Sequence, residues 1–68
     1  MAETKAELIQ KLASTVRQSG KHVTDEQARE ALARDYGDFV AAVYDPSTPA
    51  PAMSKKKLDE IAEYLMLS

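Results

Sequence analysis

Residue types that commonly carry out chemistry are scarce in this 68-residue sequence, and the first to consider is the single histidine, His22. A histidine can act as a general acid or base near neutral pH, or it can ligate a metal. Its neighbour Lys21 is basic, and the sequence shows no evident carboxylate partner for its ring. We therefore expect an exposed histidine in the connection between two helices.

Asp35 and Asp38 are the second candidate, because two carboxylates three residues apart can share one face of a helix. Such a pair beside Tyr36 could bind a cation or carry out acid–base chemistry, although a solvated helix edge is the simpler explanation. The sequence contains neither a glycine-rich phosphate loop nor the spacing of an EF-hand. We expect a protein that is not an enzyme, with no catalytic, cofactor-binding or metal-ligating residues.

Lys55, Lys56 and Lys57 form the third candidate, a run of three positive charges. They occupy the first turn of a predicted helix, where the exposed backbone amides make positive charge unfavourable. This placement suggests a use in binding, either to an acidic protein surface or to the phosphates of a nucleic acid. A solvated charge run beside a loop is the structural alternative.

The longest element that positions these groups is a predicted helix over 25–44, which we expect to organise the chain. Thr24 and Gln27 have the spacing of a capping box, which marks the start of this helix. Its apolar residues recur at helical spacing over about four turns; they are Ala28, Ala31, Leu32, Tyr36, Phe39, Val40 and Val43. An alternative is a break at Gly37, with Asp38 capping a new helix, but the unbroken apolar phase favours one helix.

Beside this apolar stripe runs a row of residues with little or no side chain, Ala33, Gly37 and Ala41. Small residues at that spacing let a second backbone approach closely. If the third helix leaves the row uncovered, the row is a docking strip with Tyr44 at its end as an aromatic anchor. If the third helix covers it, the row is internal packing.

Two shorter helices, over 5–19 and 55–67, are predicted to cover the central one. Thr4 and Glu7 form a second capping box, and the third helix begins at Ser54. The inward faces of these two helices are Leu8, Ile9, Leu12, Ala13 and Val16, and Leu58, Ile61, Ala62, Leu65 and Met66. Three prolines predict a stiff, extended connector over 45–53. We therefore expect an all-α fold, a three-helix bundle with a long central helix, in a single domain over 1–68.

Length and composition limit the functions available to this chain. It is near the lower limit for a self-sufficient core, and alanine makes up much of its hydrophobic content, which favours self-association or a protein partner. The net charge of −2, with acids and bases well mixed, gives no general attraction to nucleic acid or to anionic membranes. The sequence has no signal-peptide pattern and no apolar run near the roughly 20 residues that span a bilayer. We expect a cytoplasmic protein with no membrane partner and no cofactor.

The segment 58–68 resembles the first helix and turn of a bacterial helix-turn-helix motif. Ala62 stands at the alanine of that motif, and Leu67 and Ser68 stand at its last apolar residue and its serine. Met66 occupies the position where the family prefers glycine in the turn, and the recognition helix would begin where the sequence ends. The resemblance implies DNA binding, for which that recognition helix is required.

The function expected from these patterns is protein binding, by a small regulator, adaptor or inhibitor that occupies a surface of another protein or of a second copy. In size and style the chain resembles small regulators carried by phages or plasmids. The alternative is a nucleic-acid-associated oligomer with Lys55, Lys56 and Lys57 on phosphates. Binding through phosphates weakens steeply with added salt, which separates the two hypotheses.

Overall fold

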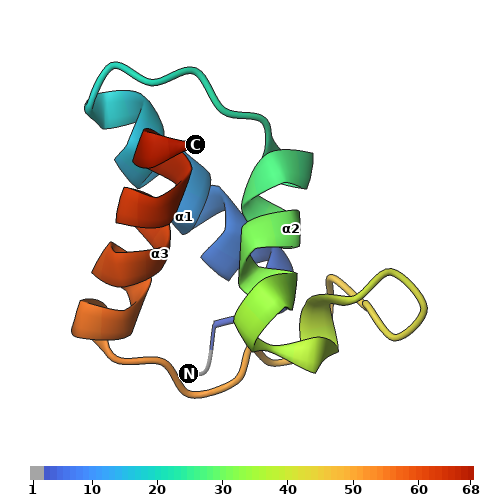
Figure 1. Ribbon diagram of the computed structural model, residues 1–68. Coiled ribbons are helices and arrows are strands. Elements are labelled where there is room, and N and C mark those ends of the chain that lie inside the picture. Colours follow the sequence, from blue (N-terminus) through green and yellow to red (C-terminus); the bar gives the residue numbers. More distant parts are fainter. Residues whose placement is uncertain (1–2) are drawn as a thin grey trace.

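Helices form the regular structure of residues 3–68, the part of the chain that the computed structural model describes. They are α1 (Lys5–Gln18), α2 (Asp25–Asp35) and α3 (Lys55–Leu67), with a short 3-10 helix, η1 (Gly37–Phe39), after α2 (Figure 1). The prediction of an all-α fold with three bundled helices is confirmed. Among the helices of residues 3–68, none has the length and apolar character needed to cross a membrane.

Each α-helix begins directly after the capping residue that was predicted for it. Thr4 Oγ1 accepts a hydrogen bond from the Glu7 amide at 3.2 Å, and Thr24 Oγ1 accepts one from the Gln27 amide at 3.1 Å. The Glu7 and Gln27 side chains accept bonds from the threonine amides in return, so both capping boxes are complete. The Ser54 hydroxyl caps α3 by accepting a bond from an amide of its first turn. These starts are local features, which is why the sequence predicts them well.

α1 lies at the centre of the packing, because it contacts both α2 and α3 more extensively than those two contact each other. Figure 1 shows α2 and α3 running antiparallel, with α1 behind them. The core contains Leu8, Ile9, Leu12, Ala13, Val16, Val23, Ala28, Ala31, Leu32, Phe39, Leu58, Ile61, Ala62 and Leu65. The prediction that the 25–44 stretch organises the chain is therefore wrong. The element around which the others pack is α1, which has 14 residues, whereas α2 has 11.

The predicted long central helix is wrong in its second half, because α2 ends at Asp35. Tyr36 is extended, with φ −130° and ψ 108°, and η1 then makes one tight turn that buries Phe39 completely. A helix over 25–44 would be about 30 Å long, whereas the 14 residues of α1 span about 21 Å. Its last turns would pass beyond the core, so turning back after Asp35 lets Phe39 join it. Val40 and Val43, predicted to face inward, are exposed instead.

The break after α2 also differs from the alternative of a second helix capped by Asp38. It falls at Tyr36, one residue before Gly37, and η1 has no side-chain cap. Within residues 3–68, Gly20 alone has a positive φ, at 98°, and it follows the C-terminus of α1 as its position predicts. Gly37 therefore does not provide the left-handed cap that would end a helix there.

The prediction of an extended connector over 45–53 is wrong in its first half, which folds into a turn. Asp45 Oδ1 accepts hydrogen bonds from the Ser47 amide at 3.0 Å and from the Ser47 hydroxyl at 2.8 Å. The Thr48 hydroxyl donates to the Asp45 carbonyl oxygen at 2.8 Å. The bonds from Ser47 lower the pKa of the Asp45 carboxyl. Aspartate side chains commonly form such local turns, which compete with an extended chain.

This turn docks on the first turn of α1. The Lys5 amide donates a hydrogen bond to the Thr48 carbonyl oxygen at 3.0 Å, and the Ala6 amide donates one to the Pro46 carbonyl oxygen at 3.2 Å. The first amides of a helix have no acceptor within the helix itself. The connector therefore satisfies two of them and is fastened to α1 in return.

Candidate functional site

The predicted docking row of Ala33, Gly37 and Ala41 is not formed as a row, because it requires a helix that continues past Asp35. Ala33 lies on α2, half-buried and packed against the core. Gly37 lies in η1 and Ala41 in the turn that follows, and both are exposed. The three residues do not make a continuous strip along which a second backbone could lie. Their role in partner binding stays a prediction without that geometric support.

Tyr44, predicted as the anchor at the end of that row, packs back onto the core. It is half-buried, and its ring centroid lies 6.4 Å from the ring centroid of Phe39. The guanidinium carbon of Arg29 lies 5.9 Å from the Tyr44 ring centroid, within the range of a cation–π contact. Tyr44 thus helps to hold the segment that follows α2.

Arg29 fastens the same segment to α2. Its side chain is only 13% exposed, and its Nη1 donates a hydrogen bond to the Phe39 carbonyl oxygen at 2.6 Å. Nε and Nη2 donate to the two carboxylate oxygens of Glu26. These bonds lower the pKa of the Glu26 carboxyl and raise the pKa of the Arg29 guanidinium. This role of Arg29 is not predictable from the sequence, because the acceptor on Phe39 becomes available only once α2 has ended.

The three lysines do not remain a free charge run. Lys55 Nζ lies 3.1 Å from an Asp59 carboxylate oxygen one turn further along α3. Lys57 Nζ lies 3.0 Å from a carboxylate oxygen of Asp35 on α2, and the hydrogen bond with Asp35 raises the pKa of Lys57. Among the ion pairs of residues 3–68, none includes Lys56. A role of this cluster in partner binding stays a prediction.

The other candidates from the sequence are separated from one another. Asp38 lies in η1, whereas Asp35 ends α2 and pairs with Lys57, so the two aspartates do not share a helix face. His22 is exposed in the connection between α1 and α2, as expected. Within the described residues, no group of three or more His, Cys, Asp and Glu side chains is placed to hold a metal ion.

The last turn of α3 departs from the helix-turn-helix resemblance. Met66 and Leu67 both belong to α3, so the chain makes no turn where the motif has its glycine. Met66, predicted to face inward, is 36% exposed, and Leu67 is 80% exposed. The end of α3 therefore presents apolar side chains to its surroundings.

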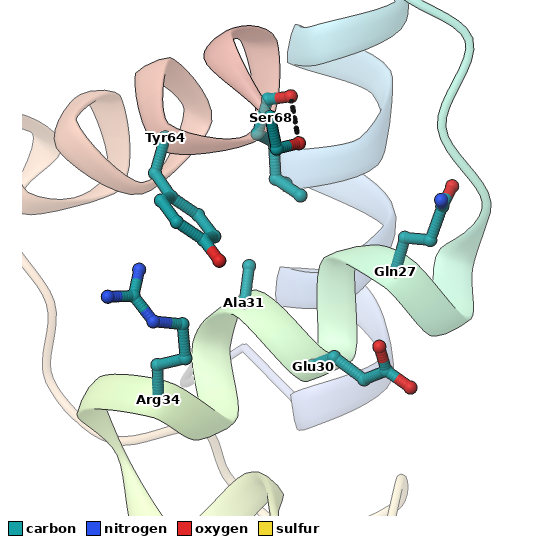
Figure 2. Close-up of a pocket in the computed structure, with 7 residues that line it drawn as sticks. Gln27, Glu30, Ala31, Arg34, Tyr64 and Ser68 are labelled. Carbon is teal, nitrogen blue, oxygen red and sulfur yellow. Dashed lines mark hydrogen bonds between the residues drawn. The ribbon is translucent and has the colours of Figure 1, made fainter.

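Two adjoining hollows form what we call the α2/α3 groove. The first has a volume of about 350 Å³ and is lined by Gln27, Glu30, Ala31, Arg34, Tyr64, Leu65 and Ser68 (Figure 2). The second has a volume of about 180 Å³ and is lined by Ala31, Arg34, Asp35, Lys57, Glu60, Ile61 and Tyr64. Ala31, Arg34 and Tyr64 line both hollows, so they mark the middle of the groove.

A cation–π pair stands at this midpoint. The guanidinium carbon of Arg34 lies 3.9 Å from the ring centroid of Tyr64, and 43% of Tyr64 is exposed. Figure 2 shows the guanidinium beside the Tyr64 ring, while the carboxylate of Glu30 points away from it. Of the ion pairs formed within residues 3–68, none includes Arg34. The positive charge of Arg34 is thus held in place by an aromatic ring without being neutralised by a carboxylate.

A third hollow, of about 310 Å³, lies between α1 and the start of α3. Its charged groups pair with one another, Lys11 with Glu3 at 4.0 Å and Lys55 with Asp59 at 3.1 Å. Its apolar lining is Leu8, Pro51, Met53 and Leu58. This hollow offers apolar surface without an unpaired charge to orient a ligand, so the α2/α3 groove is the stronger candidate.

No family model, curated protein or solved structure matches this chain. The candidate site therefore depends on the geometry of the α2/α3 groove. Neither Arg34 nor Tyr64 is among the site residues predicted from the sequence. Tyr64 carries a signal that could have been used, since it is a large aromatic residue outside the inward face of α3. Arg34 carries none, because its partner lies on another helix.

Proposed function

We propose that this chain is a protein-binding module without enzymatic activity, and that it receives a segment of another protein in the α2/α3 groove. The observation that carries the proposal is the exposed Arg34–Tyr64 pair at the middle of the groove. Tyrosine and arginine are among the residues that most often dominate the binding energy of protein interfaces. The buried side chains of Ala31, Ile61 and Leu65 line the groove beside the pair and add apolar contact surface.

The extension of the groove over two adjoining hollows suits a segment of a macromolecule. Pockets for small molecules usually have volumes of about 300–1,000 Å³. The larger hollow, at about 350 Å³, is near the lower end of that range, and the smaller one, at about 180 Å³, falls below it. An amphipathic helix laid between α2 and α3 would contact both hollows at once. A regulator, adaptor or inhibitor could act through such occupancy alone.

Ion pairing of the lysines supports a protein partner over a nucleic acid. Lys55 and Lys57 each face an aspartate, so binding a phosphate there would have to displace an existing partner. Affinity for phosphates falls steeply between about 50 and 200 mM salt. A complex formed through the α2/α3 groove is expected to keep most of its affinity over that range, which a salt titration of the captured complex measures.

The proposal is tested by capture of the partner from an extract of the native host, followed by mass spectrometry. Wild type is compared with Tyr64→Ser, which removes the aromatic half of the pair, and with Val43→Ser. Val43→Ser is a matched control, because it truncates a side chain that is 61% exposed in the turn after η1. We expect one partner to be retained by wild type and by Val43→Ser and lost from Tyr64→Ser.

Circular dichroism must show that all three proteins remain folded. Equal capture by a folded Tyr64→Ser protein would show that the groove is not the binding surface.

A further inference from the structure

We infer that the segment received by the α2/α3 groove is a helix that presents one carboxylate to Arg34, with a basic residue about one turn away on either side. The inference rests on the proposed function and specifies the chemistry of the partner. Its basis is the set of charges in the groove that other residues of the chain leave unpaired.

Arg34 is prepared to receive a carboxylate. The Tyr64 ring lies against the guanidinium, at 3.9 Å from ring centroid to guanidinium carbon. The N–H groups of a guanidinium point outward in its plane, so stacking on a ring leaves them available. A carboxylate matches this arrangement with two parallel hydrogen bonds. Stacking also restricts the Arg34 side chain before the partner arrives, so less conformational freedom is lost on binding.

Acidic residues stand on both sides of the Arg34–Tyr64 pair. Glu30 precedes Arg34 by one turn on α2, and Glu60 precedes Tyr64 by one turn on α3. Glu30 lines the first hollow and Glu60 the second. Because α2 and α3 run antiparallel (Figure 1), these two positions stand on opposite sides of the Arg34–Tyr64 pair. Neither glutamate is in an ion pair within residues 3–68.

Among the charged residues that line the two hollows, Arg34 is therefore a positive charge without an ion pair in residues 3–68, and it stands between two negative charges without one, Glu30 and Glu60. The remaining charges of the second hollow, Asp35 and Lys57, neutralise each other at 3.0 Å. A segment with basic, acidic and basic residues in succession complements this order. A nucleic acid, which is negative along its whole length, would meet repulsion at Glu30 and at Glu60. The charge order thus favours a protein segment.

A helix suits the spacing of these charges. Residues three or four apart on a helix lie about 5–6 Å from each other on one face. Glu30 and Arg34 have this separation on α2, so a partner helix with a basic residue at i and an acidic residue at i+4 can face both. Glu60 lines the second hollow together with Arg34, so a second basic residue beyond the acidic one would lie toward Glu60.

A yeast-displayed library of helical peptides with randomised exposed positions provides the test. The library is selected against wild type, and the enriched peptides are titrated against Arg34→Gln and Lys11→Gln. Lys11→Gln removes the same charge from α1, outside the groove.

We expect enriched peptides to carry Asp or Glu one turn from Lys or Arg. Their affinity should fall about tenfold or more for Arg34→Gln, as for a hot-spot residue, and stay unchanged for Lys11→Gln. Exchanging the charges, with Arg34→Glu and a lysine in place of the peptide acid, should restore part of the affinity.

Chemical shifts of the ¹⁵N-labelled protein locate the bound peptide and separate the two proposals. Peptides that shift Ala31 and Leu65 but bind Arg34→Gln as tightly as wild type would overturn the carboxylate inference and leave the protein-binding groove standing. Shifts confined to other surfaces, or a library with no enriched peptide, would overturn both. Self-association in sedimentation that Arg34→Gln abolishes would make a second copy the occupant and overturn the inference. A DNA duplex that shifts the same resonances would also overturn it.

Discussion

Arg29 Nη1 on α2 donates a hydrogen bond to the carbonyl oxygen of Phe39 at 2.6 Å, ten residues further along the chain. The Phe39 side chain is fully buried. The hydrogen bond therefore holds the backbone of Phe39, and burial of the ring holds its side chain, at the point where the chain returns to the core. Arg29 also lies against Tyr44. The turn after α2 is therefore held by one side chain of the helix that precedes it.

Arg29→Met should destabilise the protein, because it keeps the aliphatic length and removes the guanidinium. A hydrogen bond to a charged group contributes about 1.5–3 kcal/mol, and we expect a loss of that size in the free energy of unfolding. Urea unfolding followed by circular dichroism measures it. Arg34→Met is the matched control, since it loses only an exposed cation–π contact of about 0.5–1 kcal/mol. Equal unfolding midpoints for Arg29→Met and wild type would contradict the role of this bond.

Lys56→Gln and Lys57→Gln should differ in stability although the two residues are neighbours. Lys57→Gln breaks the ion pair with Asp35 that joins α3 to α2, and we expect a small loss of stability, because solvent screens exposed ion pairs. Lys56→Gln removes an exposed positive charge from the first turn of α3, where such charge is unfavourable, so stability should stay equal or rise slightly. Thermal melting of the two variants side by side decides this. A Lys57→Gln protein that melts at the same temperature as wild type would show that the ion pair does not stabilise the fold in solution.

The stability contributed by Glu26 should depend on pH in the acid range. Hydrogen bonding from Arg29 lowers the pKa of the folded Glu26 carboxyl below its ordinary value of 4.5. A lowered folded pKa gives stabilisation that is fully present above the unfolded value and is lost as the pH falls through the folded one. The difference in unfolding midpoint between wild type and Glu26→Gln should therefore be constant down to about pH 4.5 and shrink at lower pH. Urea titrations from neutral to strongly acidic pH test it, and a difference that persists unchanged in strong acid would refute it.

Ala41→Glu should leave the fold intact, because Ala41 is exposed in the turn after η1. We expect a change within about 0.5 kcal/mol in the free energy of unfolding, as for most surface substitutions. Ala28→Glu is the comparison: Ala28 is fully buried, and burying an unpaired charge there should cost about 4 kcal/mol or more. Thermal melting and sedimentation are measured together. A large loss of stability in Ala41→Glu would show that Ala41 is buried, as it would be on the continuous helix predicted over 25–44.

Helix starts could be predicted from the sequence because they depend on residues within one turn of each other. The Thr4, Thr24 and Ser54 side chains each accept a hydrogen bond from the amide three residues later in the chain. The apolar spacing of α1 was equally informative, since every residue of its predicted inward face from Leu8 to Val16 is buried. Met66 is the exception on α3, because it lies in the last turn, where the core has ended.

The end of α2 could not be predicted in this way. Continuation past Asp35 and a return into the core both suit the local sequence. The choice depends on whether Phe39 can be buried against residues supplied by distant parts of the chain. The docking of the connector has the same origin, because the amides of Lys5 and Ala6 meet acceptors forty or more residues away. The Arg34–Tyr64 pair also exists only where α2 and α3 pack together. Local hydrogen bonds set where the helices start, whereas burial against distant segments decides where α2 stops and which charges meet in the groove.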